Sequence, residues 1–228
     1  SSIQDRVIDI LRNKTELIDI RIEAARALCY ASSYSRVRDA LIDTIKYGNE
    51  PNELRIMSYK ALWNAAGSYS QMKDFLLDSL RYYEKDREAK KAVIWALFAA
   101  SNDYRVREVL LDIIKNRTSE EEVIRIEAIK SLYLGMHDYR AKETIIDIVK
   151  DKNEKKSVRL TALKALSAVN GDSRVKDLLE DMIRYEKDEE FKIAAIEASS
   201  PKQSEINEFF HLGYKIENGA YVNPIEKE

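Results

Sequence analysis

A single period runs through most of this chain and limits the folds that it can adopt. Aspartates recur at intervals of 34 or 35 residues, and a basic residue follows each of them by 11 to 13 residues. A third series pairs a small residue with Leu, as in Ala27-Leu28 and Ala61-Leu62. Three series with the same period predict that one structural unit is repeated along the chain. The aspartates are Asp9, Asp43, Asp78, Asp112, Asp147 and Asp181, and the basic residues are Arg21, Arg55, Lys90, Arg125, Arg159 and Lys192.

Each repeat contains two helical patterns. The first half reads like "RVRDALIDTI", with apolar residues at i, i+3, i+4 and i+7. The second half reads like "VRLTALKALSAV", whose recurring Ala residues allow neighbouring helices to approach closely. The joints "SND", "MHD" and "NGD" offer Asp or Ser as N-caps for the following helix. We therefore expect a first and a second helix in every repeat.

A single helix pair of this length cannot bury its apolar faces, whereas a stack of such pairs forms one continuous core. Six pairs are visible between residues 3 and 199. The sequence predicts an all-α fold, an α-α superhelix of about six helical pairs. Its predicted domains are a solenoid over residues 1–200 and a capping segment over residues 201–228.

The type of solenoid follows from the residues that recur. The tetratricopeptide and ankyrin patterns are missing from the repeats, although both have a similar period. The stretch "GDSRVKDLLEDMI" and the stretch "SVRLTALKALSAV" resemble the short HEAT-like repeats that also occur in phycobilisome-lyase-type proteins. This resemblance covers about 200 residues, and it implies an α-solenoid that binds other macromolecules.

Composition excludes several classes of function. The net charge of −2 gives no overall bias toward nucleic acid or an anionic membrane. A single cysteine, Cys29, rules out an intrachain disulfide framework and a cysteine-based metal cage. No apolar run approaches the roughly 18 residues of a membrane span. We expect a cytoplasmic protein without a membrane span.

The recurring charged residues have a structural explanation. In HEAT-like repeats, recurring Asp and Arg residues form hydrogen-bonded ladders between stacked pairs, and the resemblance implies this role for the two series here. Arg suits such a ladder because its guanidinium offers five donors in a fixed fork. A set that occurs six times is structural, since an enzyme needs only one site. We therefore predict a protein that is not an enzyme.

Cations also gather where the first helices begin. Positive charge at a helix N-terminus opposes the macrodipole by roughly 0.3–1 kcal/mol per residue, so local helix stability does not explain it. Two interpretations stay open, namely ordinary surface charge and a basic rim that docks an acidic partner or a nucleic-acid backbone. The rim cations are Arg36, Arg38, Arg105, Arg107, Arg140, Lys142, Arg174 and Lys176, with Tyr34, Tyr69, Tyr104 and Tyr139 alongside.

The second helices of such pairs usually line the concave surface of a solenoid. Counted from the basic residue of each repeat, positions five and eight are expected to point away from the Ala-Leu face. Position five is basic in four repeats but is Trp95 in the third, so Trp95 is the best candidate for an exposed anchor. Trp and Tyr anchors flanked by cations are typical of a protein-binding hot spot. The predicted partner-binding residues are Arg26, Tyr30, Tyr59, Lys60, Trp63, Trp95, Phe98, Lys130, Tyr133 and Lys164.

The predicted function is a non-catalytic scaffold that binds another protein or an acidic peptide, with a nucleic-acid-binding HEAT-like protein as the alternative. HEAT-like DNA glycosylases combine aromatic residues with a carboxylate, but here Glu23 and Glu127 are the only acids of this face near an aromatic residue. Deoxyhypusine hydroxylases hold iron with His-Glu pairs, and neither His137 nor His211 is followed by Glu. We expect no catalytic residues, no cofactor and no metal.

The period ends after "SSPKQ". The remaining residues read as a short helix followed by a hairpin in which "YKIE" and "AYVN" are joined by Asn-Gly. An isolated hairpin is marginally stable in water, so we expect it to pack onto the last repeat as a cap. A docking strand for a partner is the other interpretation of this segment.

Overall fold

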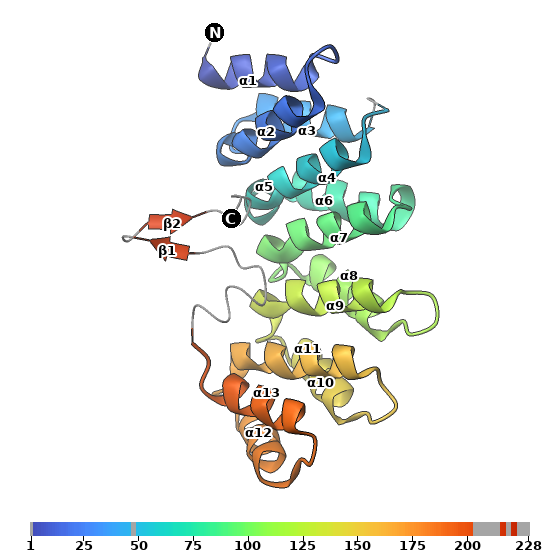
Figure 1. Cartoon of the computed structure of the whole chain (residues 1–228), viewed down its shortest axis with the longest axis vertical. Coiled ribbons are helices and arrows are strands. Elements are labelled where there is room, and N and C mark those ends of the chain that lie inside the picture. Colours follow the sequence, from blue (N-terminus) through green and yellow to red (C-terminus); the bar gives the residue numbers. More distant parts are fainter. Residues whose placement is uncertain (1, 47–48, 203–214, 218–219, 223–228) are drawn as a thin grey trace. The chain divides into compact units, whose positions relative to one another are not determined.

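The computed structural model of the chain describes residues 2–46, 49–202, 215–217 and 220–222. The chain divides into two compact units, residues 1–100 (unit 1) and residues 101–228 (unit 2). Both units consist of consecutive helix pairs, which are labelled in Figure 1. No helix among the described residues is long and apolar enough to cross a membrane.

Unit 1 contains the first three helix pairs, in which α1 packs on α2, α2 on α4, and α4 on α7. The second helices are followed closely by short segments, which are 3-10 turns at Cys29–Ala31 and Leu97–Ala100 and the helix α5 at Trp63–Ser68. A π-helical turn at Ser79–Tyr83 ends the first helix of the third pair. The main helices are α1 (Ile3–Arg12), α2 (Ile18–Leu28), α3 (Ser35–Lys46), α4 (Asn52–Ala61), α6 (Ser70–Asp78) and α7 (Arg87–Ala96).

Unit 2 contains the other three pairs, and its second helices pack side by side in the order α9, α11, α13. Two of them continue into 3-10 turns, at Tyr133–Gly135 and Leu166–Val169. The helices are α8 (Tyr104–Lys115), α9 (Glu122–Ser131), α10 (Tyr139–Lys150), α11 (Lys156–Ala165), α12 (Ser173–Tyr185) and α13 (Glu189–Ser199). The predicted all-α fold of six helix pairs over residues 3–199 is confirmed.

The first helices of unit 2 begin at the predicted caps. The side chains of Asp103, Asp138 and Asp172 accept hydrogen bonds from backbone N–H groups in the first turns of α8, α10 and α12. These bonds satisfy donors that have no partner within the helix. The apolar spacing then decides which face is buried, as in α8, where Val106, Leu110 and Ile114 lie in the core.

The predicted hairpin is also present. Strand β1 (Lys215–Glu217) pairs with β2 (Ala220–Val222) in antiparallel register, with Ile216 opposite Tyr221. The helix predicted before the hairpin and the Asn-Gly turn itself lie outside the described residues. The role of residues 201–228 as a capping segment stays a prediction.

Candidate functional site

The basic residues of the repeat hold consecutive pairs together. In unit 2, the buried Arg125 donates from Nε to the carbonyl oxygen of Ile114 at 2.8 Å. Its two terminal nitrogens donate to both carboxylate oxygens of Glu154, at 3.0 and 2.5 Å. The carbonyl belongs to the first helix of the same pair, and the carboxylate precedes the second helix of the next pair. One side chain therefore joins three elements.

The same arrangement occurs in unit 1. Arg21 donates to the carbonyl oxygen of Leu11 at 2.9 Å and to Glu50 at 2.7 Å. Arg55 donates to Glu84 at 2.5 Å. In all three cases the Glu follows the Arg by 29 residues. Hydrogen bonds from Arg21 lower the pKa of Glu50, and those from Arg125 lower the pKa of Glu154.

The acidic partners are not the aspartates that the sequence suggested. Asp43 accepts a hydrogen bond from Arg12 at 2.9 Å, and the other five recurring aspartates are exposed. The expected Asp–Arg ladder is therefore wrong. Each recurring Asp lies on the outer side of a first helix, whereas Glu50 and Glu154 lie in the turn beside the buried guanidinium of the preceding pair. The sequence pattern predicted no role for these residues, although Glu50, Glu84 and Glu154 follow the same period.

The contact made by the basic residue is different at the junction between the last two pairs. Arg159 donates to the carbonyl oxygen of Val149 from two nitrogens, at 3.1 and 3.0 Å. Its guanidinium carbon lies 4.4 Å from the ring centre of Phe191, which belongs to the next pair. A cation–π contact takes the place of the ion pair here.

The rim cations join consecutive first helices. In unit 1, Arg36 pairs with Asp5 at 2.8 Å. In unit 2, Arg140 pairs with Glu108 at 2.8 Å, and Arg174 pairs with Glu143 at 2.5 Å. In each case the Arg reaches back to an acid on the first helix of the preceding pair. Glu108 raises the pKa of Arg140, and Glu143 raises that of Arg174.

A second set of rim cations binds the turns that connect consecutive helix pairs. Arg38 donates to the carbonyl oxygen of Ser33 at 2.6 Å, and its guanidinium lies 4.0 Å from the ring centre of Tyr69. Arg107 donates to the carbonyl oxygen of Asn102 at 2.9 Å. Lys142 bonds to Asp172, the N-cap of α12. These contacts stabilise the turns between consecutive pairs, and the carboxylate of Asp172 also offsets the positive charge of Lys142.

The two tryptophans of unit 1 lie together. The ring centres of Trp63 and Trp95 are 6.2 Å apart, and the Nζ atom of Lys60 lies 6.0 Å from the ring centre of Trp95. Each tryptophan is only 9% exposed, so the expected exposure of Trp95 is wrong. The reason is that position five is half-buried in its four basic equivalents as well, because long basic side chains bury their stems and keep their charge in water.

Position eight does not point outward in three of the repeats. Cys29, Phe98 and Ser167 are all buried. The second helices end one or two residues after position five, and in these three repeats position eight falls in the tighter 3-10 turn that follows. The rotation of 100° per residue, which holds for an α-helix, therefore no longer gives the direction of the side chain at position eight. Tyr59 is buried too, and this burial raises its pKa.

The predicted site residues thus fall into separate groups. In unit 1 the structure brings Lys60, Trp63 and Trp95 together, while Arg26 bonds to Glu23 at 3.1 Å and Tyr30 is exposed. In unit 2, three of the predicted residues are half-buried and lie on the second helices or in the turn that follows α9. Burial raises the pKa of one of them, Tyr133. These three residues are Lys130, Tyr133 and Lys164.

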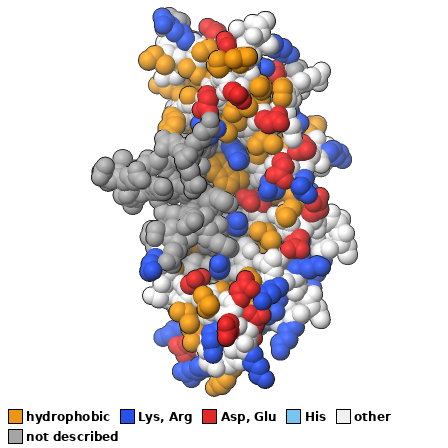
Figure 2. All heavy atoms as spheres, viewed as in Figure 1, with side chains coloured by type: hydrophobic (Ala, Val, Ile, Leu, Met, Phe, Trp, Pro, Cys, Tyr) orange, Lys and Arg blue, Asp and Glu red, His pale blue; other side chains and the backbone are white. Residues whose placement is uncertain are grey.

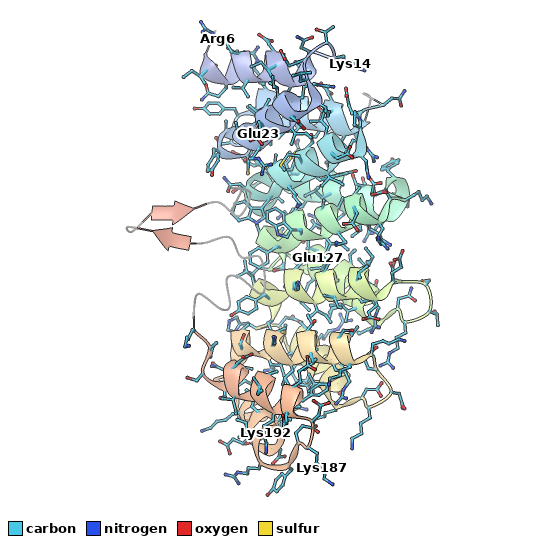
Figure 3. The ribbon with its side chains drawn as sticks, in the orientation of Figure 1. Arg6, Lys14, Glu23, Glu127, Lys187 and Lys192 are labelled. Carbon is cyan, nitrogen blue, oxygen red and sulfur yellow. The ribbon has the colours of Figure 1, made fainter. Side chains whose placement is uncertain are left out.

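The acids weighed for a glycosylase-like site belong to different units. Figure 3 labels Glu23 on α2 in unit 1 and Glu127 on α9 in unit 2. Glu23 is bonded to Arg26, and Glu127 is buried. Among the residues that the structure describes, no group of three or more His, Cys, Asp or Glu residues is placed to hold a metal ion.

A cleft in unit 2 was not foreseen from the sequence. It has a volume of about 540 Å³ and lies along α8 and α10. Arg117 lines it and bonds to Asp151 at 2.6 Å and Glu154 at 3.0 Å. Because acids and bases line it together and bond to each other, the cleft offers no concentrated charge for a small ion.

The comparison with known families agrees with the repeat pattern. Residues 107–200 match the family model for HEAT repeats. No curated protein matches the chain. The match lies in unit 2, and unit 1 carries the same helix pairs and the same buried Arg–Glu contacts. The phycobilisome-lyase subtype stays a prediction. Residues 107–200 are thus similar to HEAT repeats, and the helix pairs of unit 1 continue the same repeat pattern.

Proposed function

We propose that the chain is a non-catalytic scaffold that binds another protein through the second-helix face. HEAT repeats usually mediate protein–protein interaction, which agrees with this role. The second-helix face is proposed for each unit by itself, with Arg26, Tyr30 and Lys60 in unit 1 and Lys130, Tyr133 and Lys164 in unit 2. The observation that carries the proposal is the basic position five, which recurs in four of the six pairs.

The chemistry of this face favours an acidic partner. Lys60 lies beside a tryptophan pair, so its charge is held next to a rigid apolar surface. Tyr30 is 59% exposed and offers an aromatic anchor with a polar end. An acidic peptide with apolar side chains would satisfy both kinds of contact. The buried Tyr59, Phe98, Trp63 and Trp95 support the face from beneath and are not proposed to touch the partner directly.

Nucleic acid is the less favoured partner. The cations best placed to follow a phosphate backbone are those of the rim, and Arg36, Arg140 and Arg174 are each bonded to a carboxylate. Phosphate binding would have to break these ion pairs, and the net charge of −2 gives no general attraction.

Binding experiments with charge-reversed variants test the proposal. The double variants Arg26→Glu/Lys60→Glu and Lys130→Glu/Lys164→Glu reverse the charge of the face in one unit at a time. The matched controls Lys85→Glu and Lys150→Glu reverse exposed cations elsewhere in units 1 and 2. Each protein is used in quantitative pull-downs from lysate and in titrations with acidic peptides selected on the wild type.

The expected result is that at least one face variant loses the partners that both controls retain. Binding that is equal in all four variants would overturn the proposal. A separate titration with duplex DNA at rising salt addresses the alternative, since phosphate binding weakens steeply with salt. DNA binding that is abolished by reversing Arg36 or Arg140 would favour the basic-rim interpretation instead.

A further inference from the structure

The N-terminal end of unit 1 exposes residues of a type that the other pairs bury. Ile20 on α2 is 42% exposed, and Ile3 on α1 is 79% exposed. Ile20 precedes the ladder Arg, and the residues at this position in the other five pairs are 0–3% exposed. The position packs against the preceding pair, as Phe191 shows by its contact with Arg159. The equivalent residues are Leu54, Ala89, Ile124, Val158 and Phe191.

The C-terminal helix pair of unit 2 has the complementary feature. Ile196 on α13 is 50% exposed, whereas the residues at its position in the other five pairs are 0–1% exposed. This position packs against the following pair, as the stacking of Tyr59 on Phe75 of the next first helix shows. The neighbouring Ile193 is 55% exposed. The equivalent residues of Ile196 are Ala25, Tyr59, Ile94, Ile129 and Leu163.

The first and the last helix pair therefore both expose apolar side chains at positions that are buried between consecutive pairs elsewhere in the chain. Figure 2 shows hydrophobic side chains gathered over the N-terminal helices. A contiguous apolar patch of this kind marks an interaction surface.

The charges of the two terminal pairs match in the same register. Lys192 occupies the position of Arg21 and Arg125, and it is labelled on α13 in Figure 3. Glu16 lies 34 residues before Glu50 and occupies its position in the repeat. A copy stacked on the C-terminal pair would bring its Glu16 to Lys192, as Glu50 is brought to Arg21 within the chain.

A second pair of charges matches in the same way. Arg12 bonds to Asp43 of the next pair at 2.9 Å. Arg184 follows Asp181 by three residues, as Arg12 follows Asp9, so Arg184 would meet Asp9 of the stacked copy. Two ion pairs and one apolar contact of the internal junction would thus be restored.

We propose that the chain associates with itself head to tail, the N-terminal pair of one copy packing on the C-terminal pair of another. The occupant of each end is a second copy of this chain, because apolar positions and both charges are complementary in one register. The contact is heterologous, so each copy can bind one neighbour at each end and the assembly can grow. This inference does not depend on the partner proposed for the second-helix face.

Variants that block one end at a time test the inference in the full chain. Ile20→Lys blocks the N-terminal end, and Ile196→Lys blocks the C-terminal end. Both residues are half-exposed, so the changes should leave the fold intact, which circular dichroism checks. Val123→Lys is the control, since Val123 is 41% exposed on α9 but lies at neither end. Molar mass is measured by sedimentation equilibrium from micromolar to millimolar concentration.

The wild type and the Val123→Lys control should show a mass that rises with concentration. Each single-end variant alone should remain a monomer, and their mixture should form a dimer and nothing larger. A wild type that is monomeric throughout would overturn the inference and favour residues 201–228 as the cover of the C-terminal pair. A single-end variant that dimerises alone would also overturn it, because the contact would then join two like ends.

Charge exchange tests the register. The mixture of the two single-end variants is used again, with Glu16→Lys added to the protein that carries Ile196→Lys. This change should weaken the dimer, because it places a second positive charge beside Lys192 of the other copy. Adding Lys192→Glu to the protein carrying Ile20→Lys should restore it. Failure of the second change to restore the dimer would contradict the proposed register and with it the head-to-tail contact.

Discussion

Arg125 and Glu154 face each other through two hydrogen bonds across consecutive helix pairs of unit 2, 29 residues apart in the chain. Both side chains are almost completely buried. Arg21 and Glu50 repeat this relationship in unit 1. The contact links one repeat to the next at three junctions, and it explains why Arg recurs near the start of the second helix at Arg21, Arg55 and Arg125.

Removal of one partner should leave a buried charge without compensation. We predict that Glu154→Ala lowers the free energy of unfolding by about 3–5 kcal/mol, since breaking a buried pair by removing one partner costs this much. Asp147→Ala, which changes an exposed acid of the same unit, is the control and should change it by less than about 0.5 kcal/mol. Urea unfolding followed by circular dichroism gives both values, and equal stabilities of the two variants would contradict the structural role.

The same pair predicts a dependence on pH. Because hydrogen bonds from Arg125 lower the pKa of Glu154 in the folded chain, the ionised carboxylate stabilises the fold. This stabilisation is complete above the unfolded pKa of about 4.3 and is lost as the pH falls through the lower folded value. Stability measured from neutral to acidic pH should therefore fall less steeply for Glu154→Gln than for the wild type. Parallel curves for the two proteins would disprove the linkage.

Gly135 is required by a close approach of two backbone segments. A Cβ atom at this position would lie 2.5 Å from the carbonyl oxygen of Ser101, whereas one at Gly171 would meet nothing within 4 Å. We predict that Gly135→Ala lowers the unfolding free energy by about 1–3 kcal/mol through overpacking. Gly171→Ala should have little effect, and a thermal shift of the same size in both variants would show that the backbone contact is not the cause.

The tryptophan pair should report a buried environment. Trp63 and Trp95 should emit at short wavelength and be quenched weakly by acrylamide until the chain unfolds. Trp95→Ala should lower the unfolding free energy by about 3–5 kcal/mol, because it leaves a cavity beside Trp63. Tyr30→Ala changes an exposed aromatic residue and should cost less than about 0.5 kcal/mol. Strong quenching in the native state would contradict this environment.

Much of the fold could be predicted from the sequence, because the period, the helix caps and the apolar spacing are local signals. Asp103, Asp138 and Asp172 cap helices as their sequence context indicates. The contacts between consecutive helix pairs were harder to predict from the sequence. The partner of Arg125 lies 29 residues away, and only the three-dimensional stack shows that it is Glu154 rather than a recurring Asp.

The candidate site was predicted less well, for two physical reasons. Trp95 replaces residues such as Lys60 whose charge suggested exposure, yet the stem of a Lys side chain is half-buried and a ring can fill the same space. Cys29 and Phe98 were placed on an outward face by counting along an α-helix, but the backbone changes to a 3-10 turn at or before these residues. Neither effect has a sequence signal as strong as the repeat itself.

The proposed function depends on the binding of an acidic protein segment to the second-helix face. Its most direct test is the dissociation constant of a wild-type-selected acidic peptide, measured by calorimetry for Arg26→Glu/Lys60→Glu, for Lys130→Glu/Lys164→Glu and for the controls Lys85→Glu and Lys150→Glu. Binding should be at least about tenfold weaker for a face variant, a loss of about 1.4 kcal/mol, and the constant should be unchanged for both controls. A constant that is the same in all four variants, or that weakens only in the controls, would contradict the proposed function.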